Sequence, residues 1–113
     1  MNLLQEIEPI KTRDFLQDKF REYYNSAKIT LPPRFTAREW GFLNWGGGIM
    51  NRHVRFGTTT EINNYLKKIA PAHSYHSVAY YKDPGSKLMV EKKWQGADLI
   101  FDLDADHLPE MEE

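Results

Sequence analysis

The sequence predicts a small α+β domain in which helices flank a mixed or antiparallel sheet. Two observations carry this prediction. Helical and alternating apolar patterns follow one another in the order helix, hairpin, helix, strand, strand. The chain has 113 residues with 41% hydrophobic content, which is enough for one modest core. We therefore expect residues 1–113 to form a single domain.

The first element is a predicted amphipathic helix over residues 13–25. Apolar and aromatic side chains recur there at helical spacing, and Thr12 precedes them as the expected N-cap. The stretch Leu31-Pro-Pro-Arg34 then separates this helix from the elements that follow, because proline cannot continue a helix.

A β-hairpin is predicted next, with strands over residues 37–45 and 49–56. The triplet Gly46-Gly-Gly48 between them indicates a loop of about three residues. Glu39 and Arg52 fall on the two strands, where they form either a surface ion pair of little energetic value or part of an anion-binding site.

The second half of the domain begins with a capping box. Thr58 and Glu61 have the spacing at which the cap hydroxyl and the glutamate accept from each other's free amides, and the helix they open ends at Pro71. Residues 74–81 predict a third strand. Residues 86–94 fit either a short helix or a strand.

The most informative stretch is Leu99-Ile-Phe-Asp-Leu-Asp-Ala-Asp-His107. On a strand, Asp102 and Asp104 would share one face at about 6.6–7 Å, while Phe101 and Leu103 would point into a core. Two carboxylates that close repel each other unless a cation lies between them. Hard oxygen donors on a rigid strand suit Mg²⁺ or Mn²⁺.

The acidic stretch admits two other interpretations. A calcium loop requires glycine where His107 stands and an apolar residue where Pro109 stands, so it is disfavoured. A solvated acidic turn after a buried strand remains an alternative. Asp98 and Asp102 bracket an apolar run, which argues against it, because carboxylates aimed at one point need a partner.

Charge and composition exclude several classes. The net charge is −1, so no global basic field indicates nucleic acid, and no cysteine is present for disulfides or cysteine-ligated zinc. The longest apolar runs fall short of the roughly 18 residues that a membrane span needs. The small basic group of Lys87, Lys92 and Lys93 fits a nucleic-acid contact, but a solvated face is the favoured interpretation.

Four motifs stand in a specific order: Arg38-Glu-Trp-Gly-Phe42, Met50-Asn-Arg-His-Val-Arg-Phe56, Tyr75-His-Ser-Val-Ala-Tyr-Tyr81 and Gly96-Ala-Asp-Leu-Ile-Phe-Asp-Leu-Asp-Ala-Asp-His-Leu-Pro109. Together they resemble the N-terminal part of the small catalytic subunit of archaeal and eukaryotic DNA primase, the archaeal form most closely. The resemblance implies the N-terminal part of the primase fold.

The resemblance also implies a site. It assigns the catalytic, metal-binding acids of the family to Asp102 and Asp104, with Mg²⁺ or Mn²⁺ as the cofactor. It assigns the nucleotide pocket to Glu39, Arg52 and, more loosely, His73. The implied activity is two-metal nucleotidyl transfer, in which short primers for DNA replication are made on a template.

The implied partners are a large regulatory subunit, a single-stranded DNA template and nucleoside triphosphates, with no membrane. The implied location is the cytoplasm of an archaeal cell, or the nucleus in a eukaryote. A third carboxylate, a Ser-x-His motif and a zinc element would lie downstream. We therefore expect these 113 residues to be cut soon after the acidic motif and to be inactive alone. The alternatives are a non-catalytic, primase-derived scaffold module of a replication complex, and a primase-polymerase of repair type.

Overall fold

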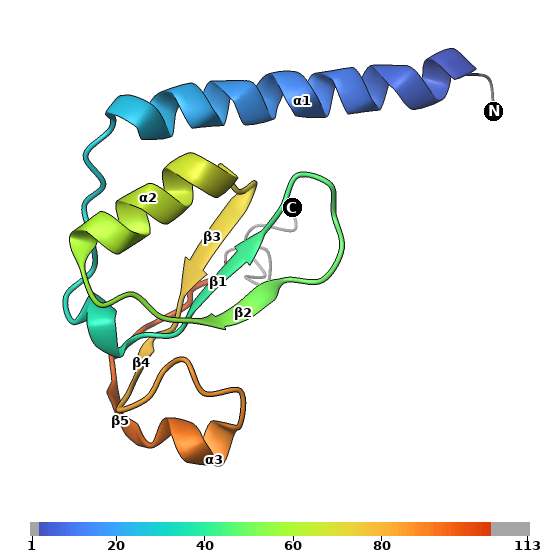
Figure 1. Cartoon of the computed structure of the whole chain (residues 1–113). Helices are drawn as coiled ribbons and strands as arrows, with labels where there is room; N and C mark the ends of the chain where they lie inside the picture. The colour runs from blue at the N-terminus through green and yellow to red at the C-terminus, as the bar shows by residue number, and fades with distance from the viewer. Residues whose placement is uncertain (1–2, 105–113) are drawn as a thin grey trace.

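The computed structural model describes the backbone of residues 3–104 and the side chains of residues 8–104 (Figure 1). In chain order the elements are α1 (Leu3–Ser26), the 3₁₀ turn η1 (Phe35–Ala37), β1 (Trp40–Leu43), β2 (Asn51–Val54), α2 (Thr59–Ile69), β3 (His73–His76), β4 (Ala79–Tyr81), α3 (Met89–Lys92) and β5 (Trp94–Ala97). No helix in this part of the chain is long and apolar enough to cross a membrane.

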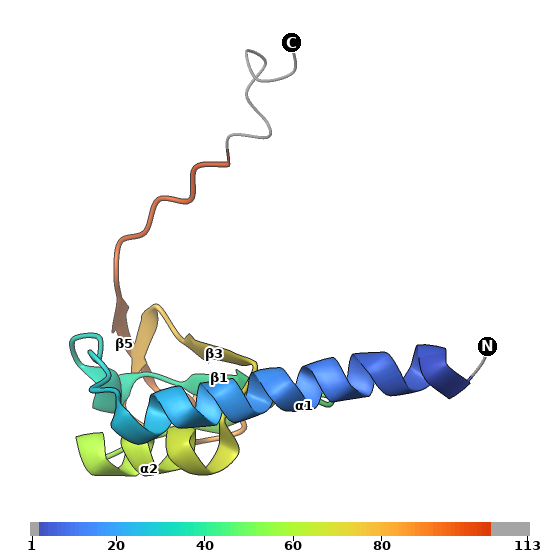
Figure 2. The same ribbon diagram turned by 90° about the horizontal axis from the view of Figure 1, so that it is seen from above.

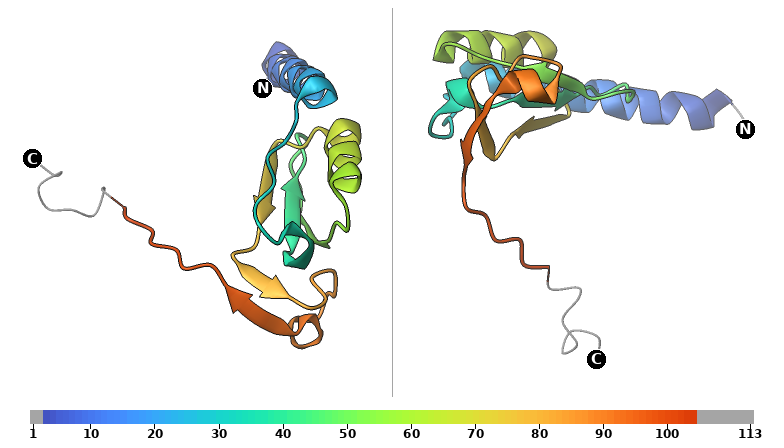
Figure 3. Two further views of the ribbon diagram at one scale, coloured as in Figure 1. Left: turned by 90° about the vertical axis from the view of Figure 1, so that its left-hand side faces the viewer. Right: turned by 90° about the horizontal axis from the view of Figure 1, so that it is seen from below.

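The strands form two small antiparallel sheets, which confirms the predicted α+β class with antiparallel pairing. One sheet has the order β2–β1–β3, and the other pairs β4 with β5. Figure 3 shows α2 lying against one face of the three-stranded sheet, while residues 98–104 lead away on the opposite side.

Helix α1 is longer than predicted. It runs through Pro9 and begins at Leu3, so Thr12 lies inside the helix and the predicted N-cap is wrong. Its second half contacts the rest of the fold: Gln17 Nε2 donates to the carbonyl of Ile69 at 3.3 Å. The first turns of α1 project past the sheet (Figure 2).

The predicted hairpin forms, but its strands are shorter and its loop longer than expected. β1 and β2 pair over four residues each, and residues 44–50 connect them rather than three glycines. Gly47 and Gly48 adopt positive φ angles of 77° and 94°, which glycine tolerates without strain. His53 also has a positive φ, and a register shift between the two strands ends their regular alternation.

The capping box at the start of α2 is confirmed in its main contact. Thr58 Oγ1 accepts a hydrogen bond from the Glu61 amide at 3.1 Å. The carboxylate of Glu61 accepts from the amide of Gly57 at 2.9 Å, one residue earlier than the capping-box pattern predicts. The side chain of Thr58 therefore pairs one of the free amides in the first turn of the helix, that of Glu61.

The core lies between α2 and the three-stranded sheet. Its buried members are Trp40, Phe42, Phe56, Ile62 and Leu66. Ile62 and Leu66 are four residues apart, so they share the face of α2 that meets the sheet. The aromatic rings meet mostly edge to face, which is a favourable arrangement.

The predicted strand over residues 74–81 is two strands in two different sheets. The break falls at Ser77, whose hydroxyl donates to the carbonyl of Ala79 at 2.7 Å and accepts from the Glu39 amide at 3.0 Å. A side chain that bonds locally to the backbone competes with the sheet ladder. Residues 86–94, for which helix and strand both fitted, contain α3 and the start of β5.

The acidic stretch does not form the predicted strand. β5 ends at Ala97, and residues 98–104 lead away from both sheets (Figures 2 and 3). The prediction that Phe101 and Leu103 point into a core is wrong, because their exposed fractions are 79% and 92%. A strand is stabilised by hydrogen bonds to a neighbouring strand, and the described residues offer none here. Asp106, His107 and Pro109 lie outside the described residues.

Candidate active site

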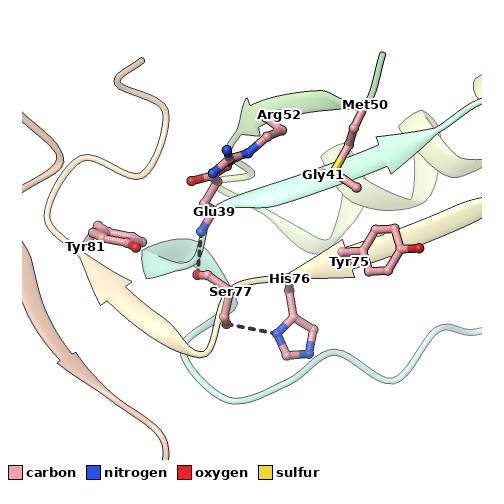
Figure 4. Close-up of a pocket in the computed structure, with 8 residues that line it drawn as sticks. All are labelled: Glu39, Gly41, Met50, Arg52, Tyr75, His76, Ser77 and Tyr81. Carbon is pink, nitrogen blue, oxygen red and sulfur yellow. Dashed lines mark hydrogen bonds and ion pairs between the residues drawn. The ribbon is translucent and has the colours of Figure 1, made fainter. Parts of the chain in front are cut away.

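A cavity of about 210 Å³ opens on the three-stranded sheet (Figure 4). Its lining residues are Glu39, Gly41, Met50, Arg52, Tyr75, His76, Ser77 and Tyr81. Gly41 pairs directly with Tyr75 on the neighbouring strand. Its chain neighbours Trp40 and Phe42 point into the core under α2, so Gly41 and Tyr75 lie on the other face of the sheet. The cavity therefore opens mainly on the face away from the helix. Two of these residues, Glu39 and Arg52, are the ones that the primase resemblance assigns to a nucleotide pocket, and the fold brings them together.

Glu39 is the electrostatic centre of this pocket. Its side chain is 8% exposed, and Oε2 accepts hydrogen bonds from Arg52 Nε at 3.1 Å and from the His53 amide at 3.2 Å. Oε1 lies 3.5 Å from Lys92 Nζ. Burial raises the pKa of Glu39, but the bonds from His53 and Arg52 and the charge of Lys92 outweigh it. The net effect lowers the pKa below 4.5, so Glu39 is ionised at neutral pH.

Arg52 presents its guanidinium to the pocket while Glu39 holds it in place. Its side chain is 55% exposed, and the bond to Glu39 uses Nε. Within residues 8–104, no hydrogen bond engages its two terminal amino groups. A guanidinium oriented in this way can bind a phosphate through those amino groups.

His73 stands beside the pocket rather than in its lining. It is the exposed first residue of β3 and pairs with Leu43. Its ring stacks on that of Tyr75, with centroids 6.2 Å apart and an interplanar angle of 23°. Tyr75 lines the cavity, so the two rings extend the pocket along β3.

The prediction that Lys92 is exposed to solvent is wrong. This lysine was expected on a solvated face with Lys87 and Lys93, but its side chain is completely buried. Its ammonium donates to the carbonyl of Pro84 at 2.8 Å and to that of Ser86. The sequence does not indicate which of the three neighbouring lysines is buried. Sequence reasoning therefore missed this partner of Glu39.

Arg38 is the second buried charge that sequence reasoning missed. Its guanidinium donates to the carbonyls of Pro33 at 3.0 Å and Ser77 at 2.8 Å, and to the Tyr80 hydroxyl at 3.2 Å. Its Nη1 also lies 2.8 Å from Asp98 Oδ2. The sequence shows Arg38 inside a motif, but its partners come from distant parts of the chain.

Asp98 and Tyr80 complete this cluster. The Tyr80 hydroxyl donates to Asp98 Oδ1. The hydrogen bond from Arg38, followed by that from Tyr80, lowers the pKa of Asp98 below 3.8. The same bond to Asp98 raises the pKa of Tyr80 above 10.0. Asp98 is therefore an anion held by two donors.

Asp102 and Asp104 are exposed on the segment that follows Asp98. Their chemistry fits a divalent ion, because carboxylate oxygens are the donors that Mg²⁺ and Mn²⁺ prefer. Among the described residues no group of three or more His, Cys, Asp or Glu side chains could hold a metal ion. This part of the chain thus contributes two candidate ligands, and neither is among the residues that line the pocket of Glu39 and Arg52.

The chain is similar to curated small subunits of archaeal DNA primase. The DNA primase small subunit PriS of Methanocella arvoryzae is 51% identical over 102 residues, which cover 88% of this chain and 26% of the relative. PriS of Methanococcoides burtonii is 52% identical over 103 residues, with the same coverage. PriS of Methanothrix thermoacetophila is 51% identical over 100 residues, which cover 88% of this chain and 25% of the relative.

No protein-family model matches the chain. The chain spans about a quarter of the length of the curated relatives it matches. Over 88% of its own length it is similar to the archaeal DNA primase small subunit, which confirms the resemblance that its four motifs carry.

Proposed function

We propose that this chain supplies part of the nucleotidyl-transfer site of a DNA primase small subunit of the archaeal type. The whole protein would synthesise short primers for DNA replication from nucleoside triphosphates on a single-stranded DNA template. The identity of 51–52% over 88% of the chain is the observation that carries this proposal. The ion pair of Glu39 with Arg52 in one pocket supports it.

In this proposal the pocket receives the nucleoside triphosphate. Arg52 binds its phosphates through the terminal amino groups, and the ionised Glu39 fixes the orientation of that guanidinium. His73 and Tyr75 border the place where the rest of the nucleotide would lie. A neutral histidine contributes shape and hydrogen bonding there rather than charge.

Asp102 and Asp104 would hold the divalent ion, Mg²⁺ or Mn²⁺. When bound, such ions activate a 3′-hydroxyl and stabilise the leaving pyrophosphate. The two carboxylates act only if the segment over residues 98–104 lies against the sheet that carries the pocket. A further ligand would come from outside the described residues, since three carboxylates hold the ions in the family that the motifs resemble.

The proposed partners are a large regulatory subunit and the DNA template, in the cytoplasm of an archaeal cell. The side chains of Leu99, Phe101 and Leu103 are apolar and exposed. This supports the proposal that another surface of the whole protein packs against this segment. Burying them would also give the acidic segment the fixed geometry that metal binding needs.

The test is Asp102→Asn in the full native polypeptide together with its large subunit. Primer synthesis should be lost while the melting temperature stays unchanged, because asparagine keeps the shape and removes the anionic donor. Asp14→Asn, an exposed acid on α1, is the matched control and should retain synthesis. Wild-type primer synthesis by Asp102→Asn would contradict the proposal.

A further inference from the structure

Two successive residues tie the three-stranded sheet to the two ends of β5. Glu39 contacts Lys92, the last residue of α3 and two residues before β5 begins, with 3.5 Å between Oε1 and Nζ. Arg38 contacts Asp98, the residue after Ala97, with 2.8 Å between Nη1 and Oδ2. The acidic segment therefore leaves the fold from a strand that is fixed at both ends.

We propose that Arg38 is a positioning residue for the acidic segment, which it anchors through Asp98. This inference rests on the proposed function, because it assigns to the Arg38–Asp98 pair the task of fixing where Asp102 and Asp104 begin their approach to the pocket. Arg38 touches neither substrate nor metal in this account. It acts through the chain that it holds.

The anchor is rigid on the Arg38 side. A buried guanidinium is tolerated only when its donors are paired, and this one donates to Pro33, Ser77 and Tyr80 as well as contacting Asp98. The guanidinium carbon of Arg38, Cζ, also lies 4.7 Å from the centre of the Tyr80 ring. These contacts come from separate segments of the chain and hold the guanidinium from several sides.

The anchor is also rigid on the Asp98 side. Oδ2 contacts Arg38 and Oδ1 accepts from the Tyr80 hydroxyl, so the carboxylate is held at both oxygens. The Asp98 amide donates to the carbonyl of Val78 at 2.9 Å, which extends the β4–β5 pairing by one residue. An isolated surface ion pair would fix little, but this one joins a buried arginine to an ordered backbone.

The position of this anchor sets the distance from the acids to the pocket. Four residues of extended chain span at most about 14 Å, so Asp102 stays within that distance of Asp98. Glu39 lines the pocket and is the neighbour of Arg38, with consecutive Cα atoms about 3.8 Å apart. Losing the anchor would enlarge the volume that Asp102 samples and lower its effective concentration at the site.

The experiment uses the full native polypeptide with its large subunit and Mn²⁺ as the probe. Binding of Mn²⁺ is measured by electron paramagnetic resonance without nucleotide, beside primer synthesis and the melting temperature. For Asp98→Ala we expect roughly tenfold weaker Mn²⁺ binding for each folded molecule, the size typical of residues that orient metal ligands. Tyr80→Phe removes only one hydroxyl and should weaken binding in the same direction, by less.

Leu66→Ala is the control for simple destabilisation, because it opens the core under α2 away from the anchor. It should lower the melting temperature and leave the Mn²⁺ affinity of the folded molecules unchanged. The proposal is overturned if Asp98→Ala behaves like Leu66→Ala. Should Asp98→Ala fail to fold, Tyr80→Phe carries the test, and unchanged Mn²⁺ affinity in that variant overturns the proposal.

Asp102→Asn separates this inference from the proposed function. If Asp102→Asn keeps both Mn²⁺ binding and primer synthesis, the proposed function is overturned. The inference about Arg38 is then overturned with it, because Asp102 does not bind the metal ion. If Asp102→Asn loses both while Asp98→Ala binds Mn²⁺ like the wild type, the proposed function stands and only the anchor is overturned.

Discussion

The ammonium of Lys92 lies 3.5 Å from Glu39 Oε1 although the Lys92 side chain has no solvent exposure. This contact links the loop that carries α3 to the sheet that carries the pocket. Two backbone carbonyls share the same ammonium, so the charge is removed from water with several partners in place. Glu39 in turn directs Arg52 toward the pocket, and a lysine outside the cavity lining thus contributes to the geometry of the cavity.

Lys92→Met should lower the free energy of unfolding by about 2–4 kcal/mol. The change keeps the volume but leaves the carbonyls of Pro84 and Ser86 without their donor and removes one partner of Glu39. Urea denaturation measures the loss. Lys87→Met alters an exposed lysine nearby and should change stability by less than about 0.5 kcal/mol. Equal losses in the two variants would show that burial of Lys92 contributes nothing.

Glu39 should make the stability depend on pH below 4.5. Its folded-state pKa is lowered, so its stabilising contribution is fully present above the unfolded-state pKa, near 4.5, and is lost as the pH falls through the folded-state value. Measuring the unfolding free energy from pH 6 downward, at about half-unit steps, should give a decline in this window. In Glu39→Gln the decline should be shallower. An identical pH profile in the variant would exclude Glu39 as its source.

Gly41→Ala should reduce nucleotide binding while keeping the fold. A Cβ at this position would stand 3.0 Å from Met50 Sδ and 3.6 Å from the Asn51 carbonyl, so the flexible methionine must move within the pocket. We expect the KM for nucleoside triphosphates in the full protein to rise roughly tenfold, the effect of one badly placed methyl group.

The matched control for that change is Gly46→Ala in the β1–β2 loop, where no atom lies within 4 Å of the added Cβ. This variant should bind nucleotide like the wild type. If Gly41→Ala and Gly46→Ala have the same KM, the cavity beside Glu39 and Arg52 does not receive the nucleotide.

Thr58→Ala should lower the melting temperature through the N-terminus of α2. Thr58 Oγ1 accepts from the Glu61 amide, and losing an N-cap of this type costs about 1 kcal/mol. Thr60→Ala, in an exposed position of the same helix, should be neutral or slightly stabilising, since alanine favours helices. Thermal unfolding monitored by circular dichroism compares the two, and a smaller loss in Thr58→Ala than in Thr60→Ala would contradict the assigned cap.

Local chemistry let the sequence predict several elements directly. The cap of α2 depends on Thr58 and Glu61, which are three residues apart, and the hairpin turn depends on glycines that tolerate positive φ. The α+β class follows from the order of such local patterns. The primase resemblance also comes from the sequence alone, because the four motifs keep their order and spacing regardless of how they pack.

Other features were decided by the tertiary structure, because they depend on partners far along the chain. Lys92 is buried beside Glu39 while Lys93 is exposed, and only the fold distinguishes them. The strand pattern over residues 74–81 is split where Ser77 bonds to Glu39, a contact between distant segments.

The structure of the acidic stretch also depends on partners that sequence patterns do not reveal. Its alternating pattern predicts a strand, but a strand exists only where another strand pairs with it, and the described residues provide no pairing beyond the Asp98 amide. The sequence by itself predicted which residues would bind an ion and a nucleotide. The tertiary structure decided that Glu39 and Arg52 meet in a pocket and that Arg38 anchors Asp98, because ion pairing requires proximity that sequence spacing does not encode.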